Sequence, residues 1–303
     1  MAQTTMVAEA IVAANPGLSY ELVSMTTEGD RRLDKSLASF GGKGVFIKEL
    51  EVALFEGRAD IAVHSLKDMP AEVLPEFMLA AVLHREDPRD VFVARGGVDG
   101  IRFMDLPAGA RVGTGSIRRV VQLKALRPDL EYVPIRGNIQ TRLSKLSELD
   151  GVVLAAAGLK RMGLADQVTE YFSTEQMLPA SGQGILAIET LSGKAAGPAE
   201  VPALLARVND SATYCIAVAE MAYLKALNAG CQFPVASFAE YGDVAQTTGM
   251  NRSLKLRGIY WDEKSARLLR AEVESPVDCS AENAVIQSRA AGCALAEKIR
   301  EQL

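Results

Sequence analysis

The chain has 303 residues, of which 49% are hydrophobic and 23% charged, and its formal net charge is −5. This composition is that of a soluble globular protein, and the length suits two or three domains of roughly 100 residues each. The mild negative charge argues against a dedicated nucleic-acid binder, and no apolar run approaches the ~20 residues of a membrane span.

The first half of the chain alternates helix-like and strand-like segments, which is typical of an α/β fold. Helices are predicted over residues 5–14 and 44–56, and strands over residues 19–25, 61–63 and 78–83. The segment Asp87-Pro88-Arg89-Asp90 then interrupts the pattern. We expect the chain to cross there into a second domain.

The second domain is predicted to repeat this alternation, and a third module follows it. Strands are predicted over 91–93, 111–113, 132–135, 152–156 and 185–189, and helices over 117–126 and 139–149. A boundary near residue 204 precedes a helix over 210–227, strands over 254–260 and 268–273, and a helix over 281–301. We therefore expect domain 1 to span residues 1–84 and 185–203, domain 2 residues 89–180, and domain 3 residues 206–303.

The segment 59–70 contains an ionisable pair at a position suited to chemistry. Its short buried strand stops at His64, so Lys67 and Asp68 lie just past the carboxyl end, the edge at which open α/β sheets bind ligands. A carboxylate beside an ammonium is suited to handling protons or stabilising a cationic intermediate. A surface ion pair on a loop is the alternative interpretation.

A basic stretch lies between residues 111 and 145, where eight basic residues accompany two acidic ones. Thr114-Gly115-Ser116 stands between a strand and a helix, so its N–H groups and hydroxyls are placed to cradle an oxyanion. Arg118 and Arg119 follow in the first helical turn, where cations are unfavourable unless an anion binds there. Because guanidinium groups bind carboxylates bidentately, we expect a ligand with several carboxylates. The basic residues are Arg111, Arg118, Arg119, Lys124, Arg127, Arg136, Arg142 and Lys145.

Other interpretations of the basic residues stay open. RNA is a rival ligand, but Tyr132 is the only aromatic residue available for stacking in this stretch. A solvated helix face is an alternative for Arg118 and Arg119, and it is the favoured interpretation for Lys124 and Arg127. The sequence Gly41-Gly42-Lys43-Gly44 before a helix is suited to holding an anion in a backbone nest, but it lacks the spacing of a nucleotide-binding loop.

The four cysteines lie in the last third of the chain at wide spacings, far from the two histidines, so we expect no metal site. The amino terminus lacks the basic start and apolar core of a signal peptide, which predicts a cytoplasmic protein without disulfides. Cys231 follows a glycine in a short turn before Pro234, a position that suits a covalent attachment or a nucleophile. An inert thiol is the alternative there.

These motifs resemble those of the hydroxymethylbilane synthase (porphobilinogen deaminase) family. They fall in the family's order across nearly the whole chain, and only the C-terminal part matches loosely. The matching motifs are Gly41-Gly42-Lys43-Gly44 through Glu49, residues 59–70 with His64-Ser65-x-Lys67-Asp68-x-Pro70, Arg85-Glu86-Asp87-Pro88-Arg89-Asp90, Gly113-Thr114-x-Ser116-x-Arg118-Arg119, Arg136-Gly137-Asn138 with Arg142, Ala157-Gly158-Leu159-Lys160-Arg161, Leu178-Pro179-Ala180-x-Gly182-Gln183-Gly184, and Gly230-Cys231-Gln232-x-Pro234.

The resemblance implies a reaction and a cofactor. Four porphobilinogen molecules are joined head to tail, each losing ammonia, to give hydroxymethylbilane. The growing chain is carried by a dipyrromethane, itself built from two substrate units and attached to Cys231 through a thioether. At the matching position, Asp68 is the catalytic carboxylate, which contacts pyrrole N–H groups, assists loss of the amino group and stabilises the cationic azafulvene intermediate.

The resemblance also implies which residues hold the acetate and propionate groups. It assigns cofactor binding to Ser65, Lys67, Thr114, Ser116, Arg118, Arg119, Arg136 and Arg142, and substrate binding to Lys43, Arg118, Arg142 and Arg161. The expected fold has two periplasmic-binding-protein-like α/β domains around a cleft, plus a smaller α+β C-terminal domain that presents the cysteine. We expect a monomer with a small-molecule substrate and no nucleic-acid or membrane partner.

The sequence departs from the family's pattern at its start and at three positions. The family opens with a strand followed by Arg-x-Ser-x-Leu-Ala, whereas this chain begins at about the end of that motif. We expect domain 1 to lack its first strand, and a parallel sheet that loses an interior strand loses ladder hydrogen bonds. Ser39, Gly115 and Met221 replace the usual lysine, serine and arginine, and the lost charges would weaken carboxylate binding or interdomain pairing.

These departures leave a second hypothesis, a non-catalytic anion-binding relative of the same fold. Asp68 and Cys231 discriminate between the two hypotheses, because a protein that only binds a solute needs neither.

Overall fold

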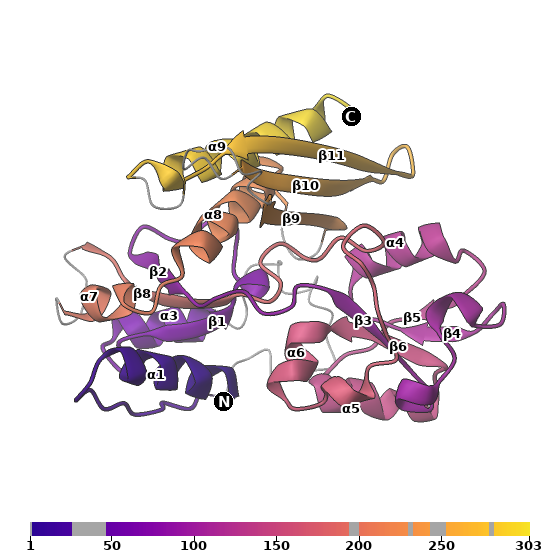
Figure 1. Cartoon of the computed structure of the whole chain (residues 1–303), viewed down its shortest axis with the longest axis horizontal. Coiled ribbons are helices and arrows are strands. Elements are labelled where there is room, and N and C mark those ends of the chain that lie inside the picture. The colour runs from indigo at the N-terminus through magenta and orange to yellow at the C-terminus, as the bar shows by residue number, and fades with distance from the viewer. Residues whose placement is uncertain (1, 26–46, 194–199, 230–232, 243–252, 279–281) are drawn as a thin grey trace.

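The computed structural model describes residues 2–25, 47–193, 200–229, 233–242, 253–278 and 282–303. Figure 1 shows three units: two α/β units side by side at the lower left and lower right, and a third unit above them. The first unit holds the amino-terminal helix, the second unit the middle of the chain, and the third unit the carboxyl terminus. None of the described helices is long and apolar enough to cross a membrane.

Among the described residues, the first unit is built on a three-stranded sheet in the order β1-β8-β2. Both ladders are antiparallel, because β8 arrives from the second unit and runs back between the other two strands. The prediction of a parallel sheet in domain 1 is therefore wrong for the described strands. The strands span Ala62–Ser65 (β1), Phe77–Val82 (β2) and Leu186–Leu191 (β8).

Helices cover both faces of this sheet. The apolar side chains of α1 (Ala2–Ala14) and α7 (Val201–Ala206) pack with those of β2 and β8 on one face, and α3 (Lys48–Phe55) covers the other face. Helix α1 ends at the predicted Asn15-Pro16-Gly17, where the Asn15 side chain donates to Ile11 O over 2.8 Å. Residues 44–46 of the second predicted helix lie outside the described residues.

The strand predicted over residues 19–25 is wrong. The chain there is irregular, and Tyr20 and Val23 are each 47% exposed. Alternating apolar residues form a strand only where a neighbouring strand accepts their backbone hydrogen bonds, and none of the described strands pairs with this segment.

The second unit contains a five-stranded sheet in the order β5-β4-β6-β3-β7. Strands β5, β4 and β6 are parallel, and β3 runs antiparallel to β6 and β7. Every residue of β3 is buried: Val91 and Val93 join the core on one face of the sheet, and Phe92 and Ala94 the core on the other. The strands span Asp90–Ala94 (β3), Arg111–Gly113 (β4), Glu131–Val133 (β5), Gly151–Ala155 (β6) and Glu170–Tyr171 (β7).

The prediction for the helices of the second unit is confirmed only in part. Helix α4 spans Ile117–Leu126, as predicted, whereas the helix predicted over 139–149 ends at Ser144 and continues as a 3₁₀ turn. Helix α6 and the short strand β7 were not predicted. The remaining helical segments are α5 (Ile139–Ser144), α6 (Ala156–Arg161) and the 3₁₀ turns Gly97–Asp99, Phe103–Asp105, Lys145–Ser147 and Ala165–Gln167.

The third unit is an antiparallel sheet, in the order β11-β10-β9, with two helices packed against it. Helix α8 (Ser211–Ala226) begins at Asp210, whose side chain accepts from Thr213 N over 2.7 Å. Strand β9 was not predicted, because its first five residues are all buried and give no alternating pattern. The other elements are β9 (Val235–Tyr241), β10 (Ser253–Asp262), β11 (Arg267–Pro276) and α9 (Ala284–Arg300).

One hydrophobic core joins the third unit to the first. It contains Tyr223 and Cys215 of α8 together with Leu66, Val82 and Ile185, which lie directly after β1, at the end of β2 and directly before β8. The third unit therefore rests on the same edge of the sheet at which β1 and β2 end.

Candidate functional site

The chain crosses twice between the first and second units, and the two crossing segments lie side by side. Glu86 N on the outgoing segment donates to Gly184 O on the return segment over 3.1 Å. Gly184 has φ +89°, and a Cβ there would lie 2.3 Å from Glu86 O. Gly182 has φ +74°, and a Cβ there would lie 2.9 Å from Lys67 N. The return segment therefore needs both glycines to pass this close to the outgoing segment and to the end of β1.

Lys67 and Asp68 lie directly after β1, as predicted, in the 3₁₀ turn Leu66–Asp68. Leu66 and Met69 are buried and anchor the turn, whereas Asp68 is exposed and Lys67 is partly buried. Burial lowers the pKa of Lys67, Asp68 opposes this shift, and the positive charges of Arg118 and Arg119 add to it. The turn of the first unit and the arginines of the second unit thus share one electrostatic environment.

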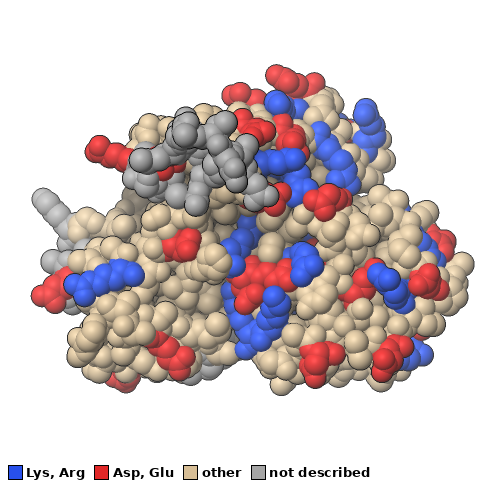
Figure 2. Space-filling model, viewed as in Figure 1, with Lys and Arg blue, Asp and Glu red and all other residues tan. Residues whose placement is uncertain are grey.

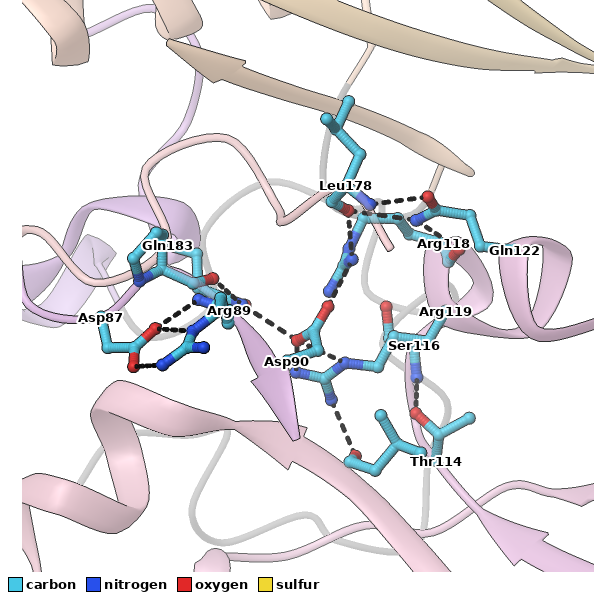
Figure 3. Close-up of polar contacts among 12 residues, drawn as sticks. Asp87, Arg89, Asp90, Thr114, Ser116, Arg118, Arg119, Gln122, Leu178 and Gln183 are labelled. Atoms are coloured by element: carbon cyan, nitrogen blue, oxygen red, sulfur yellow. Dashed lines mark hydrogen bonds and ion pairs between the residues drawn. The ribbon is translucent and has the colours of Figure 1, made fainter. Parts of the chain in front are cut away.

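Arg118 and Arg119 are buried and bind Asp90, the first residue of β3 (Figure 3). Arg118 Nη1 donates to Asp90 Oδ2 over 2.8 Å, and Arg119 Nε and Nη2 donate to Asp90 Oδ1 over 3.0 and 2.7 Å. Burial opposes ionisation of Asp90, but the two guanidinium groups outweigh it and hold the pKa of Asp90 well below its usual range. The solvated helix face considered for this arginine pair is therefore wrong.

Two glutamines complete this buried network. Gln183 Nε2 donates to Asp90 Oδ1 over 2.9 Å and to Pro88 O over 2.7 Å, so the return segment is tied to the outgoing one. Gln122 exchanges hydrogen bonds with the backbone of Leu178 (Figure 3). The sequence alone did not indicate these roles of Asp90 and Gln183, although both residues lie in motifs that resemble those of the family.

Arg142 lies on the second unit within the influence of the same charges. Its Nε donates to Gly137 O over 2.8 Å, which holds the side chain against the loop before α5. Burial lowers the pKa of Arg142, the charge of Arg119 lowers it further, and the charge of Asp68 opposes both. The charges of Lys67, Asp68, Arg118, Arg119 and Arg142 thus influence one another across the two units.

The remaining predicted residues of the second unit occupy the loops at this end of its sheet. Thr114 is buried and its hydroxyl accepts from Ser116 N over 3.4 Å, directly before α4. Arg136 is exposed. Arg161, at the end of α6, donates through Nη2 to Gly184 O over 2.6 Å, and its buried Nε has no hydrogen-bond partner among the described residues. Burial lowers the pKa of Arg161, and Glu86 opposes this shift.

Ser65 is the last residue of β1, and its hydroxyl donates to Gln3 Oε1 over 3.1 Å. Its predicted role in cofactor binding is not tested by this contact. Lys43 and Cys231, together with Ser39, lie outside the described residues.

The structure accounts for two of the unusual residues. A Cβ at Gly115 would lie 2.5 Å from Ile135 O, so a serine would displace the neighbouring loop. Met221 packs against the core shared by the first and third units, where its apolar side chain contributes contacts. The prediction that Arg127 lies on a solvated helix face is wrong. Its side chain is 13% exposed and binds Asp129 and three backbone carbonyls.

The outgoing crossing segment carries a cluster of charges at the middle of the face shown in Figure 2, where acidic and basic side chains gather between the two lower units. Asp87 is nearly buried and pairs with Arg89 over 2.7 Å and with Lys160 over 3.3 Å. Lys160 also pairs with Glu86 over 3.2 Å. These contacts hold the crossing segment against α6.

We expect the Asp87 pairs to make stability depend on pH. Burial raises the pKa of Asp87, but the bonds to Arg89 and Lys160 outweigh it and lower the pKa from 3.8 to about 2. Because the folded-state pKa is depressed, the stabilisation is complete above pH ~4 and is lost as the pH falls towards 2. As the pH falls across this window, the free energy of unfolding measured in urea should decrease in the parent by at most about 2 kcal/mol more than in Asp87→Asn. Equal losses in the two proteins would contradict the assignment.

The third unit is fastened to the crossing segments by a buried ion pair. Arg85 Nη1 donates to Glu220 Oε1 over 2.7 Å, and Arg85 Nε donates to Gln183 O over 2.9 Å. Glu220 is fully buried on α8 and also accepts from Gly182 N over 2.5 Å and Ala239 N over 2.8 Å. One carboxylate therefore joins both crossing segments to α8 and β9.

Two family models match the chain, and between them they cover most of its length. The first, described as "Porphobilinogen deaminase, dipyromethane cofactor binding domain", matches residues 1–197. The second, "Porphobilinogen deaminase, C-terminal domain", matches residues 214–301.

Curated relatives are similar over almost the full chain. A porphobilinogen deaminase of Syntrophus aciditrophicus (strain SB) is 47% identical over 287 residues, which cover 93% of this chain and 89% of the relative. One from Laribacter hongkongensis (strain HLHK9) is 46% identical and covers 88% of this chain and 82% of the relative. One from Syntrophotalea carbinolica is 42% identical and covers 98% and 88%, respectively.

Proposed function

The chain belongs to the porphobilinogen deaminase family, and from that premise we propose which residues perform the family's reaction. The protein is a hydroxymethylbilane synthase, a transferase of tetrapyrrole biosynthesis with a dipyrromethane cofactor. Its substrate is porphobilinogen, as the family implies. The alternative of a non-catalytic relative is not favoured, since the chain is 42–47% identical to relatives named as the enzyme. The cytoplasmic location and the monomeric state stay predictions.

We propose that Asp68 is the catalytic carboxylate. The observation that carries this proposal is its position: an exposed carboxylate just after β1, next to Lys67 and close enough to Arg142 for the two charges to interact. The oxygens of an exposed carboxylate accept hydrogen bonds, here from the pyrrole N–H groups of the ligand. The carboxylate also stabilises the positive charge left on the substrate when ammonia leaves.

The cations around Asp68 suit the carboxylates of pyrroles. A dipyrromethane built from two porphobilinogen units carries acetate and propionate groups, which guanidinium forks bind bidentately. When bound, the dipyrromethane supplies the end of the pyrrole chain to which substrate units are added.

We therefore propose that the cofactor is held by Ser65, Lys67, Thr114, Ser116, Arg118, Arg119, Arg136 and Arg142, and the substrate by Lys43, Arg118, Arg142 and Arg161. Arg118, Arg119 and Arg142 bind and orient carboxylates, and Lys67 adds positive charge beside Asp68. We keep the predicted division into three domains as part of this proposal. Its support is that the strands of each sheet come from a single predicted domain.

Replacing Cys231 with serine tests the proposed attachment site. We expect the denatured parent chain to exceed its sequence mass by one dipyrromethane and to react with Ehrlich's reagent, and Cys231→Ser to show the unmodified mass. Cys293→Ala is the matched control, because Cys293 is an exposed cysteine on α9, and it should keep the adduct. Peptide mapping that finds the adduct on Cys215 or Cys293 would refute the assignment.

A further inference from the structure

Asp90 is a fully buried carboxylate that receives four hydrogen bonds from three side chains. Two of these side chains are the proposed ligand-binding arginines, Arg118 and Arg119, and the third is Gln183 (Figure 3). Both arginines come from the first turn of α4, whereas Asp90 opens β3 and Gln183 lies on the return segment. The carboxylate therefore joins three separate parts of the chain at one point.

Each guanidinium is also held from a second side. Arg118 Nη1 donates to Leu178 O over 2.6 Å, and Arg119 Nη1 donates to Val153 O over 3.0 Å. A planar guanidinium fixed at two points has one orientation. None of the hydrogen bonds among the described residues uses Nε or Nη2 of Arg118, so the orientation that Asp90 imposes leaves donors available on that side chain.

The charges of this cluster do not balance. Asp90 supplies one negative charge against the two positive charges of Arg118 and Arg119. Excess positive charge in a buried site is unfavourable unless an anion compensates it. The network thus binds the arginines firmly and still leaves the site ready for a carboxylate ligand.

We propose that Asp90 is a positioning residue, which holds Arg118 and Arg119 in the orientation that receives the carboxylates of the pyrrole chain. This inference rests on the proposed roles of the two arginines. Gln183 extends the same function, because its amide donates both to Asp90 and to Pro88 O and so ties the outgoing segment to the return segment. The arginines of the second unit are thereby set relative to Asp68 of the first.

Asp90→Asn and Asp90→Glu test this proposal, with Asp87→Asn as the matched control. Asp87 lies three residues earlier and is also nearly buried and paired with arginine, but it has no contact with Arg118 or Arg119. Apo-protein of each variant is mixed with porphobilinogen, and intact mass follows the fraction of chains that acquire the adduct. The Michaelis constant and kcat of the loaded protein are then measured separately.

We expect loading to slow by about 10- to 100-fold in Asp90→Asn, the usual size for losing a group that orients a binding residue, with a raised Michaelis constant. Asp90→Glu keeps the charge but moves the carboxylate by one methylene, so it should fold and still load at least about tenfold slower. Asp87→Asn should load at the parent's rate despite a lower thermal midpoint. If Asp90→Asn does not fold, the result for Asp90→Glu tests the proposal. Loading of Asp90→Glu at the parent's rate would overturn the proposal.

Arginine variants separate this inference from the proposed function beneath it. If Arg118→Gln and Arg119→Lys load and turn over like the parent, the carboxylate-binding roles themselves fail. If those variants load slowly and Asp90→Glu does not, only the positioning role fails. A double variant adds a further check. In the Arg119→Lys background, Asp90→Glu should lower the loading rate little further, whereas additive losses of loading rate would contradict an action through Arg119.

Discussion

Asp68→Asn is expected to lower kcat by about 10²- to 10⁴-fold, the range over which positioned carboxylates contribute to catalysis. The neutral amide keeps the shape of the side chain but loses the negative charge that stabilises the cation formed as ammonia leaves. Because Asp68 is exposed, the substitution should leave the thermal midpoint nearly unchanged. Continuous assay of hydroxymethylbilane formation on the loaded protein measures the effect.

Asp60→Asn is the control for this experiment, since Asp60 is an exposed acid just before the other end of β1. It should retain the parent's turnover. The mass of each purified chain is checked first, so that turnover is compared only between proteins that carry the adduct. Parent-like turnover in Asp68→Asn would remove Asp68 from the proposed mechanism.

The second large effect is on stability, through Glu220. Replacing this fully buried residue with alanine leaves Arg85 without its carboxylate and leaves the N–H groups of Gly182 and Ala239 without their acceptor. Breaking a buried ion pair from one side costs about 3–5 kcal/mol. We therefore expect Glu220→Ala to lower the free energy of unfolding by that amount in denaturant titrations.

An exposed ion pair on the same helix provides the comparison. Lys225 on α8 binds Glu72 over 2.8 Å, but both side chains are more than half exposed. Glu72→Ala should therefore cost less than about 1 kcal/mol. Similar losses in the two variants would mean that burial at Glu220 does not determine the strength of this attachment.

Local patterns predicted the features that depend on neighbours in the sequence. The apolar run before Lys67 indicated a strand with Asp68 just past its end, and the pattern from Ile117 to Leu126 predicted α4 to the residue. These elements are determined by short apolar runs and by residues that begin or end them. The predicted junction of Thr114 and Ser116 with α4 follows for the same reason.

Features that depend on distant partners were not predictable in this way. The direction of β8 between β1 and β2 depends on where the chain returns from the second unit, and the pattern of β8 itself is the same for either direction. The partner of Arg118 and Arg119 lies 28 and 29 residues away at Asp90. The basic stretch predicted an anion for these arginines, and nothing local indicated that a carboxylate of the protein supplies the first one.

The strand order of the first unit has a consequence for synthesis on the ribosome. All five strands of the second unit come from one continuous stretch, residues 90–171, whereas the first sheet lacks its middle strand until residue 191 has been made. Domains fold as units while the chain emerges. The sheet of the second unit can thus form first, while β1 and β2 remain unpaired until β8 has been synthesised. During this interval the unpaired segments of the nascent chain need protection from aggregation.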